Sequence, residues 1–142
     1  MIVAAETLRG AWQLVSWSFV YEDGRPPEHP LGPDARGFIM YTDDGHVSAL
    51  LMRGERPRAA PATEAERAQA YAESFGYSGR YVVRDGTVYH TIQVATNPAL
   101  LGITSTRHIS FDGTTLTLSG PDFAPGAARS QKIVWRRPPA AT

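Results

Sequence analysis

The segment Gly79–Ile92, GRYVVRDGTVYHTI, decides the fold of this chain. Two runs of β-branched and aromatic residues flank Asp85-Gly86, a pair that favours the type I′ turn of a two-residue β-hairpin because both residues tolerate positive φ. Such a turn places Tyr81 opposite His90. The face that carries these two side chains is mostly apolar, so we expect both to point into the protein.

Three further Asp-Gly pairs, at residues 23–24, 44–45 and 112–113, help to divide the chain into short runs of β-forming residues. The sequence predicts eight strands, at residues 12–21, 37–42, 46–52, 78–84, 87–95, 104–111, 115–119 and 130–136. Short strands joined in series by tight turns are typical of an all-β, antiparallel up-and-down barrel, in which closure removes the exposed edges. We therefore expect a barrel of at least eight strands.

One helix is expected between the third and fourth strands. Thr63 and Glu66 form a capping box, apolar side chains follow at helical spacing, and Gly76 ends the segment. This helix could cover one end of the barrel. A single domain then spans residues 1–142, with the Pro-containing tail, residues 138–142, expected to be disordered.

Two irregular segments are expected at the mouth of the barrel. Residues 22–36 are rich in proline, and Ala99–Leu101 form an apolar stretch in a loop. Exposed apolar loops mark ligand entrances or protein interfaces. The alternative for both segments is a contact between two subunits.

Composition narrows the classes of function. The sequence has no cysteine, and 14 basic residues balance 14 acidic ones without a basic cluster. These features argue against disulfides, thiolate metal sites and nucleic-acid binding. No signal peptide or membrane span is recognised, so we expect a cytoplasmic protein. His29, His46 and His108 lack metal-ligand spacing, so neither a metal nor another cofactor is expected.

The turns also predict which side chains line the interior. Counting from a two-residue turn at residues 44–45, Tyr41 lies opposite Ser48. Both faces of the first strand are largely apolar, and one of them is expected to pack on the helix or on a second subunit, as in a homodimer. No Asp or Glu falls on an inward face, which disfavours reactions that use paired carboxylates. The side chains expected to contact a ligand are Trp12, Ser16, Ile39, Tyr41, Ser48, Leu50, Met52, Ile92, Ile109 and Phe111. Apolar walls with a few polar groups are typical of a small-molecule cavity.

Three inward polar side chains carry the candidate catalytic chemistry. His90 could act as a general acid or base with Tyr81 as its hydrogen-bonding partner. The alternative is a core histidine beside a wall aromatic. The positive charge of Arg107 needs a compensating partner if it is buried inside a barrel. It either pairs with an anionic ligand group, or stacks on Trp12 or another aromatic ring and closes one barrel end.

Several stretches together resemble the bacterial and fungal lipocalin-like domain family, over about residues 8–136. They are GAWQLVS (Gly10–Ser16), PLGPDARGFIMYTDDG (Pro30–Gly45), SALLM (Ser48–Met52) and YSGRY (Tyr77–Tyr81). The resemblance implies an antiparallel barrel with a central cavity, and related small barrels serve as cyclases or isomerases of polyketides. This chain has the single His90 where relatives often have two adjacent histidines.

Three functions follow as expectations from the residues and the resemblance together. The first is a barrel that binds an apolar small molecule and acts as a cofactor-independent cyclase or isomerase on a polyketide-like natural-product intermediate. The second is a non-catalytic carrier that sequesters a hydrophobic metabolite. The third is a structural domain whose barrel is packed solid.

Overall fold

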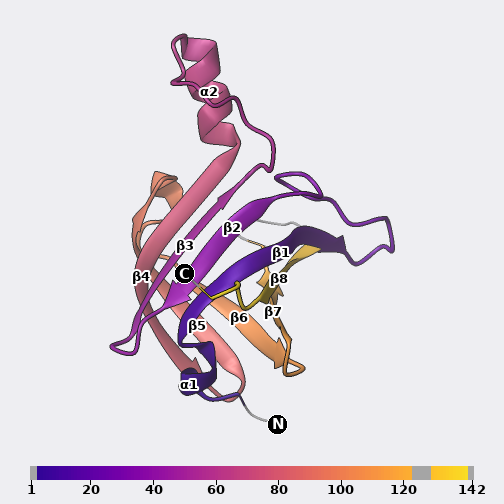
Figure 1. The fold of residues 1–142 in the computed structure, drawn as a ribbon. Coiled ribbons are helices and arrows are strands. Elements are labelled where there is room, and N and C mark those ends of the chain that lie inside the picture. Colours follow the sequence, from indigo (N-terminus) through magenta and orange to yellow (C-terminus); the bar gives the residue numbers. More distant parts are fainter. Residues whose placement is uncertain (1–2, 123–128, 141–142) are drawn as a thin grey trace.

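The computed structural model describes residues 3–122 and 129–140. In that part of the chain, eight antiparallel strands form a closed barrel in which each strand pairs with the next and β8 pairs with β1 (Figure 1). The strands are β1 (Gly10–Tyr21), β2 (Arg36–Tyr41), β3 (His46–Met52), β4 (Ser74–Arg84), β5 (Thr87–Ala95), β6 (Thr104–Phe111), β7 (Thr115–Pro121) and β8 (Arg129–Arg136). The predicted up-and-down barrel is confirmed, whereas residues 141–142 of the predicted disordered tail lie outside the described residues.

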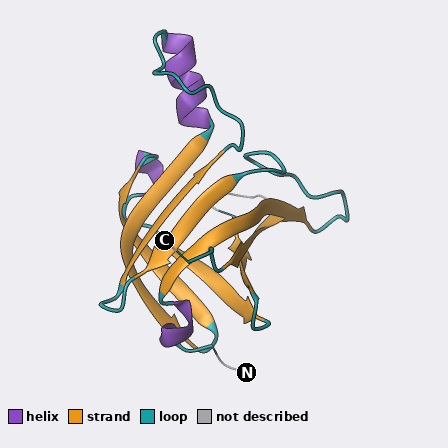
Figure 2. Ribbon diagram, in the orientation of Figure 1, coloured by secondary structure: helices purple, strands orange, loops and turns teal. Residues whose placement is uncertain are grey.

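In the described ranges, two α-helices lie at opposite ends of the barrel (Figure 2). Helix α1 (Ala5–Leu8) precedes β1, and α2 (Glu64–Ala72) connects β3 to β4 and begins with the predicted capping box. A short 3₁₀ helix, η1 (Pro98–Leu100), follows β5. Within the described residues, no helix has the length and apolar character that crossing a membrane requires.

Helix α2 lies at one end of the barrel, but it does not cover that end as the sequence analysis considered. The helix projects away from the strands in Figure 1 and buries none of its residues. Its apolar positions are mostly alanine, and alanine side chains bury little area. The helix also ends at Ala72, so Phe75 lies on β4 and packs against Trp17 inside the barrel.

The α1 end of the barrel is closed by packing. Trp12 is fully buried, and its indole N–H donates to the Leu8 carbonyl oxygen at 2.8 Å. The Arg137 guanidinium lies 3.7 Å from the centre of the Trp12 ring and donates to two main-chain carbonyl oxygens of the N-terminal segment. Arg137 therefore occupies the stacking position on Trp12 that one alternative gave to Arg107, and that alternative is wrong for this ring.

The hairpin between β2 and β3 has a different register from the predicted one. Tyr41 pairs with Val47, because residues 43–45 form a three-residue turn in which Gly45 has a φ of +92°. A shift of one residue turns every side chain of a strand to the opposite face. The predicted inward positions of Ser48, Leu50 and Met52 are therefore wrong, and the side chains that β3 places in the core are Val47, Ala49 and Leu51.

A bulge in β1 corrects a second prediction. The pairing of β1 with β8 shifts between Leu14 and Ser16, so the inward positions continue at Trp17. Trp17 lies opposite the half-buried Ile133, which in turn lies opposite the buried Leu118 of β7. Ser16 belongs to the neighbouring, outward row, and its predicted inward position is wrong. The bulge explains why both faces of this strand are apolar in the sequence.

At Asp85-Gly86 the predicted register is confirmed, because Tyr81 pairs with His90. After Phe111 a four-residue turn pairs Ile109 with Leu118, and Ile109 points inward as predicted. Among the predicted ligand contacts, Trp12, Ile39, Tyr41, Ile92 and Ile109 are buried in the barrel, and Phe111 packs edge-on against Trp12. The predicted inward positions are therefore confirmed on β2, β5 and β6, and they are wrong on β3 and at Ser16 of β1.

Candidate functional site

A pocket of about 350 Å³ includes residues of α2, the helix at the end of the barrel opposite α1, in its lining. Strands β1, β4 and β8 contribute to it, together with α2, η1 and the β1–β2 connection. Both segments that we expected at the barrel mouth contribute residues. The described residues that line it are Trp17, Phe19, Pro30, Leu31, Tyr71, Ala72, Ser74, Phe75, Thr96, Asn97, Leu100, Asp122 and Gln131. We call it the mouth pocket.

Aromatic rings form much of the wall of the mouth pocket. Trp17 and Phe75 have ring centres 4.9 Å apart, and Phe19 meets the edge of Trp17 at 5.8 Å. Tyr71 adds a fourth ring from α2. Aromatic side chains provide a large apolar area with defined contact geometry. The pocket is therefore suited to a flat, apolar guest.

A chain of hydrogen bonds runs along the polar side of the mouth pocket. The Trp17 indole N–H donates to Gln131 Oε1 at 3.0 Å, and Gln131 Nε2 donates to Asp122 Oδ1 at 3.1 Å. Arg129 Nε donates to Asp122 Oδ2 at 2.5 Å, and the Arg129 guanidinium lies 3.8 Å from the centre of the Phe19 ring. The Asp122 side chain is only 7% exposed. The expectation that no acidic side chain faces the interior is thus wrong.

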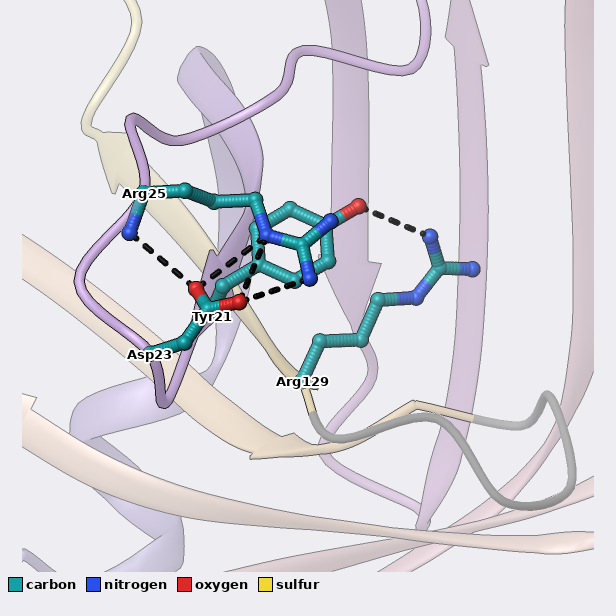
Figure 3. Close-up of polar contacts among 4 residues, drawn as sticks. All are labelled: Tyr21, Asp23, Arg25 and Arg129. Carbon is teal, nitrogen blue, oxygen red and sulfur yellow. Dashed lines mark hydrogen bonds and ion pairs between the residues drawn. The ribbon is translucent and has the colours of Figure 1, made fainter.

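Arg129 is held from a second side as well (Figure 3). Its guanidinium donates to the Tyr21 hydroxyl at 3.3 Å, and Arg25 stacks over the Tyr21 ring at 4.2 Å. Arg25 in turn forms an exposed ion pair with Asp23 at 2.7 Å. Exposed ion pairs contribute little stability. The significant contact is the one that fixes Arg129 beside the buried carboxylate.

His90 lies deeper in the barrel, between two tyrosines. Its Nε2 atom is 2.7 Å from the Tyr41 hydroxyl, and its Nδ1 atom is 2.9 Å from the Tyr77 hydroxyl. Tyr81 lies across the strand pair from His90, but its hydroxyl donates to the Thr42 carbonyl oxygen at 2.7 Å. The prediction that Tyr81 is the hydrogen-bonding partner of His90 is therefore wrong, and Tyr41 and Tyr77 take that place.

Burial keeps this tyrosine–histidine–tyrosine cluster uncharged. It lowers the pKa of His90 to about 3 and raises the pKa of Tyr77 to about 12. The pKa of Tyr41 rises well above its ordinary value for the same reason. A neutral imidazole has one donor and one acceptor nitrogen, so one phenol donates to the ring and the other accepts from it. The cluster is therefore a fixed neutral network near pH 7.

Arg107 is also buried, on β6. Its guanidinium donates to the carbonyl oxygens of Thr106 and Pro121, at 3.0 and 3.3 Å. A β-carbon at Gly120 would lie 3.1 Å from the guanidinium, so this glycine leaves room for it. Burial lowers the pKa of Arg107, and the nearby tyrosines and Asp122 oppose that shift. Its pairing with an anionic ligand stays a prediction.

The structure separates the predicted catalytic groups from the mouth pocket. Among the described residues, the pocket lining does not include Tyr81, His90 or Arg107. The sequence analysis missed Trp17 because it did not foresee the bulge in β1. It missed Phe75 because it extended the predicted helix beyond Ala72, where α2 ends. In the part of the chain that the structure describes, no cluster of three metal-ligating side chains is found.

A family model for the lipocalin-like domain matches residues 9–137. The chain belongs to this family. The resemblance recognised in the sequence is confirmed, and no curated protein matches this lipocalin-like chain. The barrel fold of the family is consistent with binding small hydrophobic ligands.

Solved structures with low sequence identity are similar to this lipocalin-like chain. A redesigned β-barrel matches with a TM-score of 0.50 and 14% identity, over 97% of each chain, which supports the fold alone. An uncharacterised protein from Bacteroides eggerthii has a TM-score of 0.48 and 15% identity, over 92% of this chain and 99% of its own. The lipoprotein YedD from Klebsiella pneumoniae has a TM-score of 0.45 and 14% identity, over 99% of this chain and 82% of its own.

Proposed function

We propose that this lipocalin-like barrel binds a small, largely apolar molecule in its mouth pocket. The observation that carries the proposal is the pocket itself, about 350 Å³ in volume, with aromatic and aliphatic walls and a few polar groups. Small-molecule sites have this size and composition. Deeper in the barrel, Tyr41 and His90 are buried and hydrogen-bonded to each other, which supports the mouth as the place for a guest.

Isothermal titration with an uncharged apolar fluorophore, N-phenyl-1-naphthylamine, tests this proposal. We expect saturable binding with one site per chain. Leu100→Arg puts a charged side chain into the pocket wall and should weaken binding at least about tenfold, or ~1.4 kcal/mol. Leu101→Arg is the matched control, because Leu101 is exposed and lies outside the described pocket lining. Absence of saturable binding, or equal effects of the two variants, would refute the proposal.

We favour a non-catalytic carrier of a hydrophobic metabolite. His90, the candidate general acid or base, is buried and has a pKa of about 3. Both of its ring nitrogens are hydrogen-bonded to tyrosine hydroxyls. A general acid or base works best when its pKa lies near the working pH. The observation thus supports sequestration over acid–base catalysis.

A cyclase or isomerase of a polyketide-like natural-product intermediate is the second candidate. The Asp122 carboxylate and Gln131 amide in an aromatic pocket favour it, because such walls could hold a flexible chain in a reactive conformer. In that case, three side chains that lie outside the pocket lining would support the site from inside the barrel: His90, Tyr81 and Arg107. Incubation of a synthetic poly-β-ketone with the protein distinguishes the candidates. Faster cyclisation that Asp122→Asn abolishes favours the enzyme, and unchanged products favour the carrier.

A further inference from the structure

We propose that two copies of this chain form a two-fold dimer through the outer surface of β2–β5, with β2 of one copy packed antiparallel on β2 of the other. The inference goes beyond the proposed function and does not depend on the mouth pocket. It concerns exposed side chains on the outside of the barrel.

The first step is the clustering of apolar side chains on one side of the barrel. Phe38 on β2 pairs with Leu50 on β3, and these residues are 44% and 60% exposed. Met40 and Val94, which are 50% and 60% exposed, lie in the next row, where two serines of β3 and β4 connect them. Strands β2, β3 and β4 lie side by side in Figure 1, so the four side chains share one surface. We call this surface the outer apolar face.

Strand β6 shows what the outside of the same barrel has elsewhere. Its exposed positions are all polar: Thr104, Thr106, His108 and Ser110. An antiparallel sheet that packs on a core with one face and meets water with the other carries polar residues on the second face. Single exposed apolar side chains are ordinary, whereas a contiguous apolar patch marks an interaction site. The outer apolar face is therefore the part of the barrel that a partner would cover.

The second step is the shape and composition of this face. A shallow groove of about 640 Å³ lies over it, and a second hollow of about 360 Å³ shares Met40 and Ser48 with the groove. Apart from Arg36 and His46 at the two ends, the described lining residues of both hollows are uncharged. The centres of protein interfaces are depleted of charged residues and enriched in aromatic residues and Met. The face thus has the composition of an interface centre.

The third step is that the two ends of β2 carry opposite charges. Arg36 is exposed at the start of the strand, and Asp43 is exposed in the turn that follows it. Among the described residues, neither side chain forms a hydrogen bond or an ion pair, and the acidic Asp34 and Glu55 near Arg36 do not bond it either. The neighbouring Asp44 is instead held within the turn by hydrogen bonds. One cation and one anion are therefore available to a partner.

A two-fold axis perpendicular to the strands brings these two charges together. When the axis runs between the row of Phe38 and the row of Met40, each of these residues faces the other one on the second copy. Arg36 then faces Thr42 of the second copy, next to Asp43, and the same pair forms again at the opposite end because the interface is isologous. An axis parallel to the strands would instead place Arg36 against Arg36. Charge complementarity suppresses wrong orientations, so it favours the antiparallel packing.

The neighbouring strands are compatible with this packing. His46 and Arg80 form the row nearest the β2–β3 turn, and Met52 and Ser74 form the row beside Arg36. The proposed axis places the first row of one copy against the second row of the other. The basic side chains of that first row therefore meet uncharged side chains, and no two cations face each other.

Sedimentation equilibrium of the purified chain tests the inference. We expect a reversible dimer, with twice the 15.5 kDa mass of one chain. Its dissociation constant should be micromolar, because an apolar centre of four side chains is small beside the roughly 20–30 residues a side of a standard interface. Protein diluted below this concentration is monomeric, and its unfolding is independent of the interface.

Met40→Glu places a charge at the centre of the outer apolar face. It should raise the dissociation constant at least about a hundredfold, because the dimer would bury two unpaired carboxylates. Thr106→Glu is the matched control, since Thr106 is an exposed strand position on the polar side of the barrel. It should leave the dissociation constant unchanged.

An exchange of charges tests the orientation of the two copies. Arg36→Glu and Asp43→Arg should each weaken the dimer about tenfold, because each change replaces two attractions in the symmetric interface by two repulsions. The double variant should restore the dimer to within about twofold of the unaltered chain. Both residues are exposed and have no side-chain partner in the described part of the chain, so these variants should fold.

Three results would overturn the inference. A chain that is monomeric at all concentrations assigns the outer apolar face to another occupant, such as a different protein. A dimer that Met40→Glu leaves intact forms through another surface. Failure of the double variant to restore the dimer excludes the antiparallel packing. None of these results bears on the mouth pocket, which fluorophore binding tests separately.

Discussion

Two tryptophans on the same strand mark the two ends of the barrel. Trp12 donates its indole N–H to a main-chain carbonyl, and Arg137 covers its ring. Trp17 donates instead to the Gln131 side chain, and its ring lines a pocket. The Trp12 contact to main chain lies at an end closed by packing, whereas the Trp17 contact to a polar side chain lies beside an open pocket. Under the proposed function, stability depends mainly on the first end and binding on the second.

The largest expected effect is on stability at the closed end. Trp12→Ala removes a fully buried ring and should lower the free energy of unfolding by about 3–5 kcal/mol. Trp17→Ala should cost clearly less, because its ring borders an existing pocket, but it should abolish binding of the uncharged fluorophore. Urea denaturation followed by circular dichroism measures both losses. Equal losses of stability would break the comparison.

The next effect concerns the neutral cluster between the two ends. The pKa of His90 is about 3 in the folded protein, below the ordinary value of 6.5. As the pH falls, the unfolded chain therefore binds a proton on this histidine at a higher pH than the folded protein does. The contribution of His90 to stability is therefore complete above pH 6.5 and is lost as the pH falls toward 3. For one such group the loss is about 2 kcal/mol between pH 6.5 and pH 5.

Urea midpoints measured from pH 7 to pH 5 test this dependence. His90→Gln should be less stable at pH 7 but should lack the part of the slope that comes from this residue. His46→Gln is the control, because His46 is exposed beside Asp44 at a hairpin turn. A slope in His90→Gln equal to that of the unaltered protein would show that the pKa of His90 is the same in the folded and the unfolded chain.

A smaller effect is expected where Arg137 covers Trp12. Arg137→Met removes the contact with the ring and two hydrogen bonds to carbonyl oxygens, at an expected cost of about 1–2 kcal/mol. The neighbouring Arg136→Met, at an exposed position, is the control. The melting temperature should fall only in Arg137→Met, and fluorophore affinity should stay unchanged. A loss of affinity would link the two ends.

The smallest effect tests the register of β3. Leu50 is 60% exposed, so Leu50→Ala should change the free energy of unfolding by less than about 0.5 kcal/mol. The adjacent Leu51 is buried, and Leu51→Ala should cost about 2–5 kcal/mol. Chemical denaturation of the two variants compares them directly. The reverse order would restore the register expected from a two-residue turn.

The fold was predictable because the hairpin signals are local. The two-residue turn at Asp85-Gly86 has the register that the sequence predicts. After Phe111, turns of two and of four residues put the same side chains on one face, so the sequence predicts that face correctly while it leaves the turn length open. The turn before His46 has three residues. One residue more than a two-residue turn moves every side chain of the strand to the opposite face of the sheet. Turn length depends on backbone conformation at Gly45, which the residue types alone do not determine.

The candidate site was less predictable, because its parts come from distant segments. Trp17 faces the pocket only because of the bulge, and Asp122 follows the end of β7 at a point where no pattern of alternation continues. Gln131 belongs to the site because it accepts a hydrogen bond from Trp17, which lies 114 residues earlier in the sequence. The faces of Tyr81, His90 and Arg107 could be predicted, but their hydrogen-bond partners could not.

The position of Trp17 has a practical consequence for following occupancy. The sequence has three tryptophans, and Trp12 and Trp135 are almost completely buried away from the mouth pocket. Indole emission responds to the polarity around the ring, so a guest should change the spectrum of Trp17 and leave that of the other two unchanged. A Trp17→Phe variant would supply the background for subtraction. The intrinsic fluorescence of Trp17 can therefore be used to screen candidate metabolites without an added label.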